Sequence, residues 1–146
     1  MLAENSKYLK ESKNYSVTED GRIYSHSRVD RTGRLHKGRW IKLTVSQDGY
    51  YKVTLHLGQR GKSITRRVCR LVAEAFIPNP ENKPCVNHLD GDKLNDSVNN
   101  LEWCTHKENT VHAWKEGLCK PYDRTKPYNR QAIVDSNKRR GKLNGL

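Results

Sequence analysis

Apolar and polar residues alternate through much of the first 65 residues of this sequence. One alternating stretch, residues 15–23, contains Asp20-Gly21, a dipeptide suited to the positive φ angles of a tight hairpin turn. A second stretch, residues 41–57, alternates on both sides of Asp48-Gly49, and a third extended run follows at residues 62–65. A two-residue period that is interrupted by turn dipeptides predicts a small antiparallel sheet.

The period changes after these strands. Apolar residues between Val68 and Phe76 recur with the i, i+3, i+4 spacing of an amphipathic helix, and Pro78 and Pro80 follow its expected end. Residues 25–39, between the first two hairpins, are polar and rich in arginine, so we expect a basic loop there.

Two short strands and a helix are predicted further along the chain. The strands fall at residues 85–88 and 100–103, and the loop between them is rich in Asp, Asn and Gly. Thr105, with Glu108 three residues later, predicts a capping box at the start of the helix, and Gly117 can stop it. The helix has an apolar stripe made of Val111, Trp114 and Leu118.

These elements predict an α+β fold. We expect a small N-terminal antiparallel sheet with a connecting helix in residues 1–80, a ββα unit in residues 81–118, and a basic C-terminal arm in residues 119–146. The last segment contains two prolines and few large apolar residues, so by itself it is expected to pack poorly.

The charge of the chain indicates its partner. The formal net charge is +12 over 146 residues, and it is uneven: residues 1–80 carry +9, residues 81–117 carry −3 and residues 118–146 carry +6. A basic balance this large favours nucleic acid, because neutralised phosphates release condensed counterions. An acidic centre between basic flanks is typical of a nuclease, whereas ribosomal and packaging proteins are usually basic throughout.

The composition also limits the class of protein. Hydrophobic residues make up 34% of the chain and the mean hydropathy is −0.98, which predicts a modest core. No apolar run approaches the roughly 18 residues of a membrane span, and the N-terminus lacks the apolar stretch of a signal peptide, so we expect an intracellular protein. The cysteines form no CxxC pair, which disfavours a disulfide framework.

A polar pattern in the predicted ββα unit points to phosphodiester hydrolysis. Asn87 and His88 end the first strand, Asn100 lies twelve residues after His88, and Asn109 lies nine residues further. Hydrolysis needs a general base for water and a divalent cation that stabilises charge on the phosphate. Neutral His88 can act as the base, and the amide oxygens of Asn87 and Asn109 can hold a hard cation such as Mg²⁺. Asn100 can tie down the loop so that the imidazole keeps one orientation.

Residues 86–96 and 100–109 together resemble the HNH motif of phage and intron-encoded homing endonucleases. Residues 70–80 resemble the lead-in that is typical of this group. The Asp-Gly-rich strands from Tyr15 onwards resemble the nuclease-associated modular domain that is often fused ahead of the motif. The similarity covers roughly residues 15–117.

The resemblance implies a ββα-metal DNA endonuclease. In such an enzyme His88 is the general base, Asn87 and Asn109 are the metal ligands, and Asn100 is the orienting asparagine. The expected ion is Mg²⁺, with Mn²⁺ as a substitute, and the product carries a 5′-phosphate. Many relatives have Asp at the position of Asn87. A neutral amide attracts a cation less than a carboxylate does, so a weakened or inactive nuclease is an alternative.

Two other metal sites can be drawn from the sequence. Zinc could be bound by Cys85, His88, Cys104 and His106, but the spacings are irregular and the site would consume the proposed base, which disfavours zinc. The aspartates of the loop do not form a calcium site of the EF-hand type, because the glutamate at the twelfth position is missing.

Double-stranded DNA is the expected partner, held mainly through its backbone. The candidate contacts are Arg28, Arg31, Arg34, Arg39, Arg66, Arg67, Arg70, Lys138, Arg139 and Arg140. One metal site per chain fits nicking of one strand, but the sequence leaves open whether the protein is a monomer or a dimer, and it does not specify the target. The alternative from another class is a non-catalytic DNA-binding protein that keeps the same scaffold.

Overall fold

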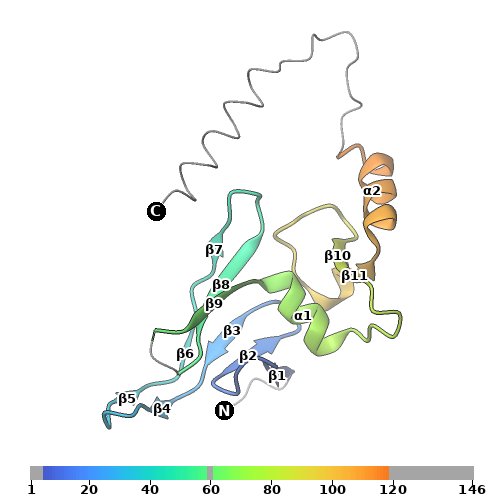
Figure 1. Ribbon diagram of the computed structural model, residues 1–146. Helices are drawn as coiled ribbons and strands as arrows, with labels where there is room; N and C mark the ends of the chain where they lie inside the picture. Colours follow the sequence, from blue (N-terminus) through green and yellow to red (C-terminus); the bar gives the residue numbers. More distant parts are fainter. Residues whose placement is uncertain (1–4, 59–60, 119–146) are drawn as a thin grey trace, which may run out of the picture.

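The computed structural model describes residues 5–58 and 61–118, and Figure 1 shows their arrangement. The first sheet is antiparallel, with strand order β1-β2-β3-β6. Its strands are β1 (Ser6–Tyr8), β2 (Tyr15–Thr18), β3 (Ile23–Ser25) and β6 (Arg39–Trp40). Gly21 has a φ of +85° in the turn between β2 and β3, so the hairpin predicted at Asp20-Gly21 is confirmed.

The arginine-rich segment is not a loop, as the sequence led us to expect, but contains a two-stranded antiparallel arm. Its strands are β4 (Arg28–Val29) and β5 (Leu35–His36). The turn is closed by the Asp30 carboxylate, which accepts hydrogen bonds from the backbone N–H of Thr32 and Arg34. Polar side chains that bond to their own backbone form such turns without apolar alternation, which is why the pattern did not reveal them.

The second sheet has strand order β7-β8-β9. Its strands are β7 (Thr44–Val45), β8 (Tyr51–His56) and β9 (Ser63–Arg67), and Gly49 has a φ of +86° in the predicted turn. In the run expected as one strand at residues 41–45, only Thr44 and Val45 form a strand, β7, which pairs with β8. The residues just before this run form β6, which pairs with β3 of the first sheet, so the chain passes from one sheet to the other within the run.

The C-terminal half of the described chain forms two helices and a hairpin. Helix α1 (Val68–Phe76) is followed by the antiparallel strands β10 (Cys85–His88) and β11 (Leu101–Cys104), with a short 3₁₀ turn at Val98–Asn100 before β11, and then by helix α2 (His106–Lys115). The predicted helices and the two short strands are therefore confirmed. No helix in the described ranges is both long enough and apolar enough to cross a membrane.

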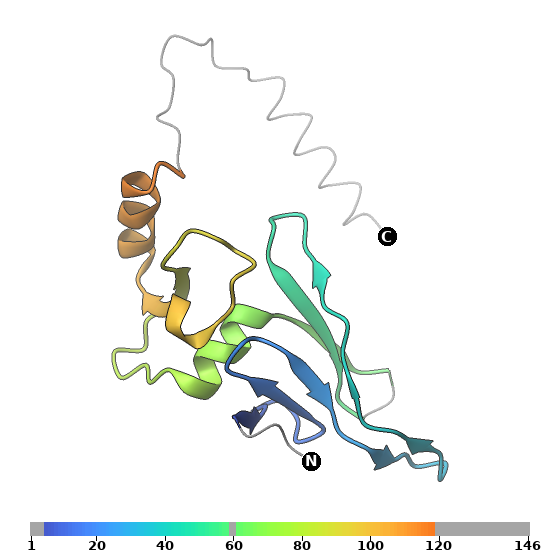
Figure 2. The same cartoon turned by 180° about the vertical axis from the view of Figure 1, so that it is seen from behind.

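A single hydrophobic core joins the two halves. Val68, Leu71 and Val72 of α1 are almost fully buried and pack against apolar residues of β2, β3 and β8. Leu101 of β11 belongs to the same cluster, so the hairpin is fixed directly against α1. Figure 2 shows the hairpin and the first sheet on neighbouring sides of α1.

Helix α2 contributes no buried residue. Val111, Trp114 and Leu118, expected as an apolar stripe, are 44%, 51% and 58% exposed, so the stripe is not buried in the core. The helix is instead held at its start, where Thr105 and Glu108 form the predicted capping box. It ends before Gly117, which has a φ of +67°.

Candidate active site

The hairpin of β10 and β11 separates two groups of polar residues. Asn87 lies opposite Glu102, and His88 lies opposite Leu101. Directly opposed residues of an antiparallel pair share one face, and successive residues alternate between faces. Asn87 and Glu102 therefore lie on one face, whereas His88 and Leu101 lie on the face that meets α1.

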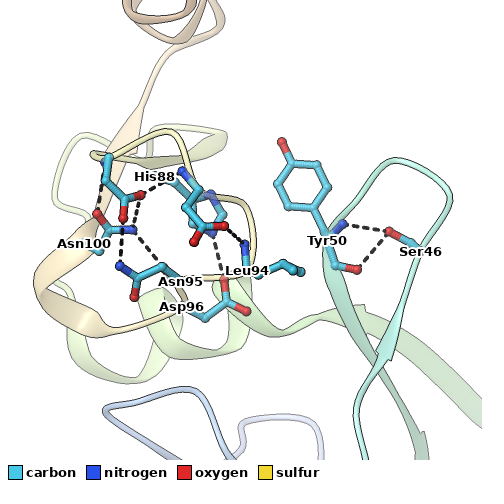
Figure 3. Close-up of polar contacts among 9 residues, drawn as sticks. Ser46, Tyr50, His88, Leu94, Asn95, Asp96 and Asn100 are labelled. Atoms are coloured by element: carbon cyan, nitrogen blue, oxygen red, sulfur yellow. Dashed lines mark hydrogen bonds and ion pairs between the residues drawn. The ribbon is translucent and has the colours of Figure 1, made fainter. Parts of the chain in front are cut away.

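His88 is held in a buried polar contact. Its Nε2 lies 2.8 Å from Oδ1 of Asp96, and the two residues are 5% and 4% exposed (Figure 3). The ring of Tyr50 lies beside the imidazole, with 5.7 Å between the ring centroids. The histidine thus has a carboxylate on one edge and an aromatic ring next to it, and only a small part of the ring reaches solvent.

Tyr50 is fixed by cations and by its own backbone. The guanidinium of Arg67 lies 4.1 Å from the ring centroid and the ammonium of Lys93 lies 4.9 Å from it. The backbone N–H and carbonyl of Tyr50 both bond to the Ser46 hydroxyl, as Figure 3 shows. Lys93 also donates to the carbonyl of Asp48, at 3.0 Å. These contacts join the second sheet to the loop between β10 and β11.

Asn100 closes that loop. Its Nδ2 donates to Oδ1 of Asp90 and to the carbonyl of Asn95, both at 2.9 Å, and its Oδ1 accepts from the backbone N–H of Asp90. The side chain of Asn95 also donates to the Asp90 carboxylate, and this bond, followed by those from the backbone N–H of Asp92 and from Asn100, lowers the pKa of the Asp90 carboxyl. The side chain that touches the imidazole of His88 is thus Asp96, while Asn100 ties the loop around it.

Asn87 is oriented by a carboxylate. Its Nδ2 donates to Oε1 of Glu102 at 2.9 Å, and the residue is 6% exposed. Within the described residues, its Oδ1 makes no hydrogen bond, so this oxygen is free to act as a ligand. The amide oxygen and the adjacent carboxylate are hard donors, which suit a cation such as Mg²⁺.

Asn109 lies on α2 and its side chain makes no hydrogen bond within the described chain. His112, three residues later and on the same side of the helix, lies with Nε2 3.2 Å from the carbonyl of Leu89, just beyond β10. This side of α2 therefore faces the end of the strand that carries Asn87. Oxygen donors from a strand and a helix can meet there around one cation.

The four residues considered for zinc do not surround one point. Cys85 lies opposite Cys104, and its Sγ is 3.2 Å from Nδ1 of His106. His88 is three positions from Cys85 on a strand, so it points to the other face. Among the described residues, the one group of three His, Cys or carboxylate side chains with ligand atoms within 4.8 Å is Cys69, His88 and Asp96. Burial raises the pKa of the Cys69 thiol to about 11, so the thiol stays protonated and is a poor metal ligand.

The arginines predicted to bind DNA fall into two groups. Arg28, Arg31, Arg34 and Arg39 lie on or beside the arm of β4 and β5, and none forms an ion pair within the described residues. A groove beside the arm is lined by Ser25, Arg28, Arg34, His36, Lys37 and Arg39.

The second group is paired with carboxylates. Arg66 pairs with Glu11, Arg67 with Asp48, and Arg70 with Glu74. Lys138, Arg139 and Arg140 lie outside the described residues.

Four residues around His88 and Asn87 were not predicted from the sequence: Tyr50, Lys93, Asp96 and Glu102. On the sequence alone Asp96 is one of the loop aspartates that do not form a calcium site, and no motif spacing connects Tyr50 with the loop. The strand register offered a signal for Glu102, because pairing residues 85–88 with the second strand places a carboxylate opposite Asn87.

Two segments of the chain match known protein families. Residues 66–111 match the family model described as HNH endonuclease, and residues 4–56 match the model of the NUMOD4 motif. The chain therefore contains an HNH endonuclease segment, with a NUMOD4 motif ahead of it. Enzymes of this family generally depend on a divalent metal.

Individual relatives agree with this assignment. DNA endonuclease I-HmuI of Bacillus phage SP01 is 34% identical over 103 residues, which cover 70% of this chain and 53% of that protein. A putative HNH homing endonuclease, YosQ, from the SPbeta prophage of Bacillus subtilis is 40% identical over 102 residues, with the same coverage of each chain. The uncharacterized HNH endonuclease L245 of Acanthamoeba polyphaga mimivirus is 37% identical over 109 residues, 75% of this chain and 30% of the relative.

The fold also matches a solved structure. A structure of I-HmuI, described as DNA binding and cleavage by this HNH homing endonuclease, aligns with a TM-score of 0.64 and 30% identity. The alignment covers 80% of this chain and 62% of that one. The mixed α+β fold is thus shared, and the chain spans between about a quarter and two thirds of the length of the relatives it matches.

Proposed function

We propose that this chain is a divalent-metal-dependent DNA endonuclease of the homing type that nicks or cleaves double-stranded DNA. The observation that carries the proposal is the arrangement of Asn87 and His88 at the end of β10, next to the side of α2 that presents Asn109. The match of residues 66–111 to the HNH endonuclease model and the similarity to I-HmuI support it.

In the proposed reaction His88 is the general base. It takes a proton from water, the water oxygen attacks phosphorus, and the bond from phosphorus to the 3′-oxygen breaks, which leaves a 5′-phosphate. Asn87 and Asn109 would hold Mg²⁺ or Mn²⁺ through their amide oxygens, and the cation supplies Lewis-acid stabilisation of charge on the phosphate. Asn100 keeps the loop closed, and Glu102 orients the amide of Asn87 and adds the negative charge that two asparagines lack.

The basic surfaces would hold the duplex. We assign backbone contacts first to the unpaired arginines of the arm, Arg28, Arg31, Arg34 and Arg39. The paired arginines Arg66, Arg67 and Arg70 are weaker candidates, because each must share its charge with a carboxylate. In this scheme residues 1–80 grip DNA, residues 81–118 cut it, and the basic residues 138–140 add further phosphate contacts.

A plasmid assay tests the proposal. Supercoiled DNA is incubated with the protein and Mg²⁺ or Mn²⁺, beside His88→Ala and a matched exposed control, His56→Ala. We expect nicking by the wild type and by the control, none with a chelator, and at least a hundredfold slower nicking by His88→Ala. Equal nicking by His88→Ala would remove His88 as the base. DNA binding with no nicking on any DNA would favour the non-catalytic alternative.

A further inference from the structure

The contact between His88 and Asp96 determines which imidazole nitrogen carries the proton. A carboxylate accepts hydrogen bonds and does not donate them, so the proton of the imidazole lies on Nε2, 2.8 Å from Oδ1 of Asp96. The lone pair then lies on Nδ1. The geometry therefore favours one of the two neutral tautomers and leaves Nδ1 as the nitrogen that can accept a proton.

Asp96 is itself held in place by the N-terminal sheet. The backbone N–H of Val98 donates to the carbonyl of Glu19, at 2.8 Å, in the turn between β2 and β3. Gly21 of the same turn lies so close that an added Cβ would be 2.9 Å from Cβ of Asp96 and 3.4 Å from its carbonyl oxygen. The position of Asp96 is thus set by a segment that is far away in the sequence.

The other carboxylate oxygen of Asp96 has an unusual environment. Oδ2 is buried and has no hydrogen-bond partner among the described residues. An unpaired buried carboxylate oxygen opposes folding, since it loses water and gains nothing in return. Costly polar groups of this kind concentrate at functional sites, where their second task explains why they are kept.

The aromatic neighbour restricts the ring from a different direction. Tyr50 directly precedes β8 of the second sheet, and Figure 3 shows it beside His88 while Asp96 lies below the imidazole. The ring of His88 is therefore bounded by residues of the loop and of the N-terminal sheets. Rotation about its side-chain bonds would break the bond to Asp96 and press against Tyr50.

We propose that Asp96 is a positioning residue that fixes the tautomer and the orientation of His88, and that the turn between β2 and β3 holds Asp96 for this task. The inference rests on the proposed role of His88 as the base. It makes the N-terminal sheet a structural part of the active site, in addition to its role in holding DNA.

Two variants of similar shape separate positioning from packing. Asp96→Asn keeps an acceptor oxygen for Nε2, whereas Asp96→Leu fills the same space without one. We expect Asp96→Leu to lower kcat about 10- to 100-fold with KM within twofold of the wild type, and Asp96→Asn to stay within about fivefold in kcat. Glu81→Gln, which removes an equal charge at an exposed position, is the control. Thermal unfolding of each variant shows that it is folded, and Asp96→Ala replaces Asp96→Leu if leucine does not fit.

The tautomer can be observed without any activity. Two-bond ¹H–¹⁵N correlation spectra of the imidazoles, with the His88 signals assigned by His88→Gln, should show the form protonated on Nε2 in the wild type and a mixture in Asp96→Leu. Protonation on Nδ1 in the wild type, or an unchanged kcat in a folded Asp96→Leu, overturns the inference. A wild type that does not nick DNA refutes the proposed function and with it the catalytic purpose of Asp96. The spectra test the hydrogen bond between His88 and Asp96 independently of any nicking activity.

Gly21→Ala tests the contribution of the turn. The added methyl group would lie 2.9 Å from Cβ of Asp96, so the turn and Asp96 must move apart. We therefore expect a lower kcat, an unchanged KM and a shifted tautomer population, in the same direction as Asp96→Leu. A folded Gly21→Ala variant with wild-type kcat and wild-type spectra would show that the turn does not hold Asp96.

Discussion

Asn87 is the residue whose chemistry the structure changes most. On the sequence alone it is a neutral amide at a position where a carboxylate would attract a cation better. In the folded chain Glu102 lies directly opposite and accepts a hydrogen bond from Nδ2 of Asn87, at 2.9 Å. The pair together carries one negative charge, and the amide oxygen is left free of the carboxylate. In the proposed metal site, the ligand oxygen and the negative charge that attracts the cation would thus come from two different residues.

Opposite changes at this pair should move the metal requirement in opposite directions. Glu102→Gln keeps an acceptor for Asn87 but loses the charge, so the Mg²⁺ concentration for half-maximal nicking should rise about fivefold. Asn87→Asp adds a carboxylate and should lower that concentration by a similar factor. The measurement is the initial nicking rate over a Mg²⁺ titration. If neither variant shifts the midpoint, the charge of Glu102 does not reach the cation.

The residues of the proposed site differ in how far the sequence could predict them. Asn87, His88, Asn100 and Asn109 are recognisable because their spacing follows from one compact unit of two strands and a helix. Asp96 is different. Its contact with His88 depends on how the loop folds back against the turn at Gly21, which is a tertiary arrangement that no local pattern encodes.

At the level of elements, prediction succeeded where the signal was local. The hairpin turns at Gly21 and Gly49, helix α1 and the capping box of α2 depend on residues that are close in sequence. The passage of the chain from β6 in the first sheet to β7 in the second depends on which strand lies alongside each, and the sequence does not contain that information locally. The exposed stripe of α2 is a second such case. Its apolar pattern predicts a helix, but it does not ensure that another element packs against that side.

Because α2 buries no side chain, its start should depend strongly on the cap. Thr105→Ala removes the hydroxyl that accepts from the backbone N–H of Glu108, at 3.2 Å, which should destabilise the helix by about 1 kcal/mol. We expect amide hydrogen exchange in α2 to quicken about fivefold, and the Mg²⁺ requirement to rise because Asn109 is held less firmly.

Thr110→Ala is the matched control for the cap. It removes the same side chain from the interior of α2, where its hydroxyl bonds only to the carbonyl of His106. Alanine is the better helix former, so exchange should be unchanged or slower. Equal acceleration by both substitutions would mean that the loss of the threonine hydroxyl, rather than the cap, governs the stability of α2.

At the scale of the molecule, the candidate active site and the arm of β4 and β5 lie apart. Figure 1 shows β4 and β5 at one end of the described chain and α2 near the other, with the two sheets and α1 between them. A duplex that reached both would run along the sheets, so the arm would add phosphate contacts without touching the scissile bond. Binding strength and cleavage rate should then be separable by substitution.

Single substitutions in the arm test this separation. Arg31 and Arg34 are exposed and unpaired within the described chain, so each can neutralise a phosphate. Arg31→Ala and Arg34→Ala should each weaken DNA binding and reduce the slope of log K against log salt by about 0.9 for each phosphate that the variant no longer neutralises. Arg22→Ala is the control, because it removes an equal charge that already pairs with Asp20 at 2.8 Å.

The same variants should cleave normally once DNA is saturating, because in the proposed arrangement the arm of β4 and β5 would lie away from the reacting phosphate. Binding isotherms at several salt concentrations give the slope, and single-turnover nicking at high protein concentration gives the rate. A reduced single-turnover rate in Arg31→Ala or Arg34→Ala would mean that the arm also sets the position of the scissile phosphate. An unchanged salt slope would mean that the duplex lies elsewhere, and the paired arginines Arg66, Arg67 and Arg70 would become the better candidates for backbone contact.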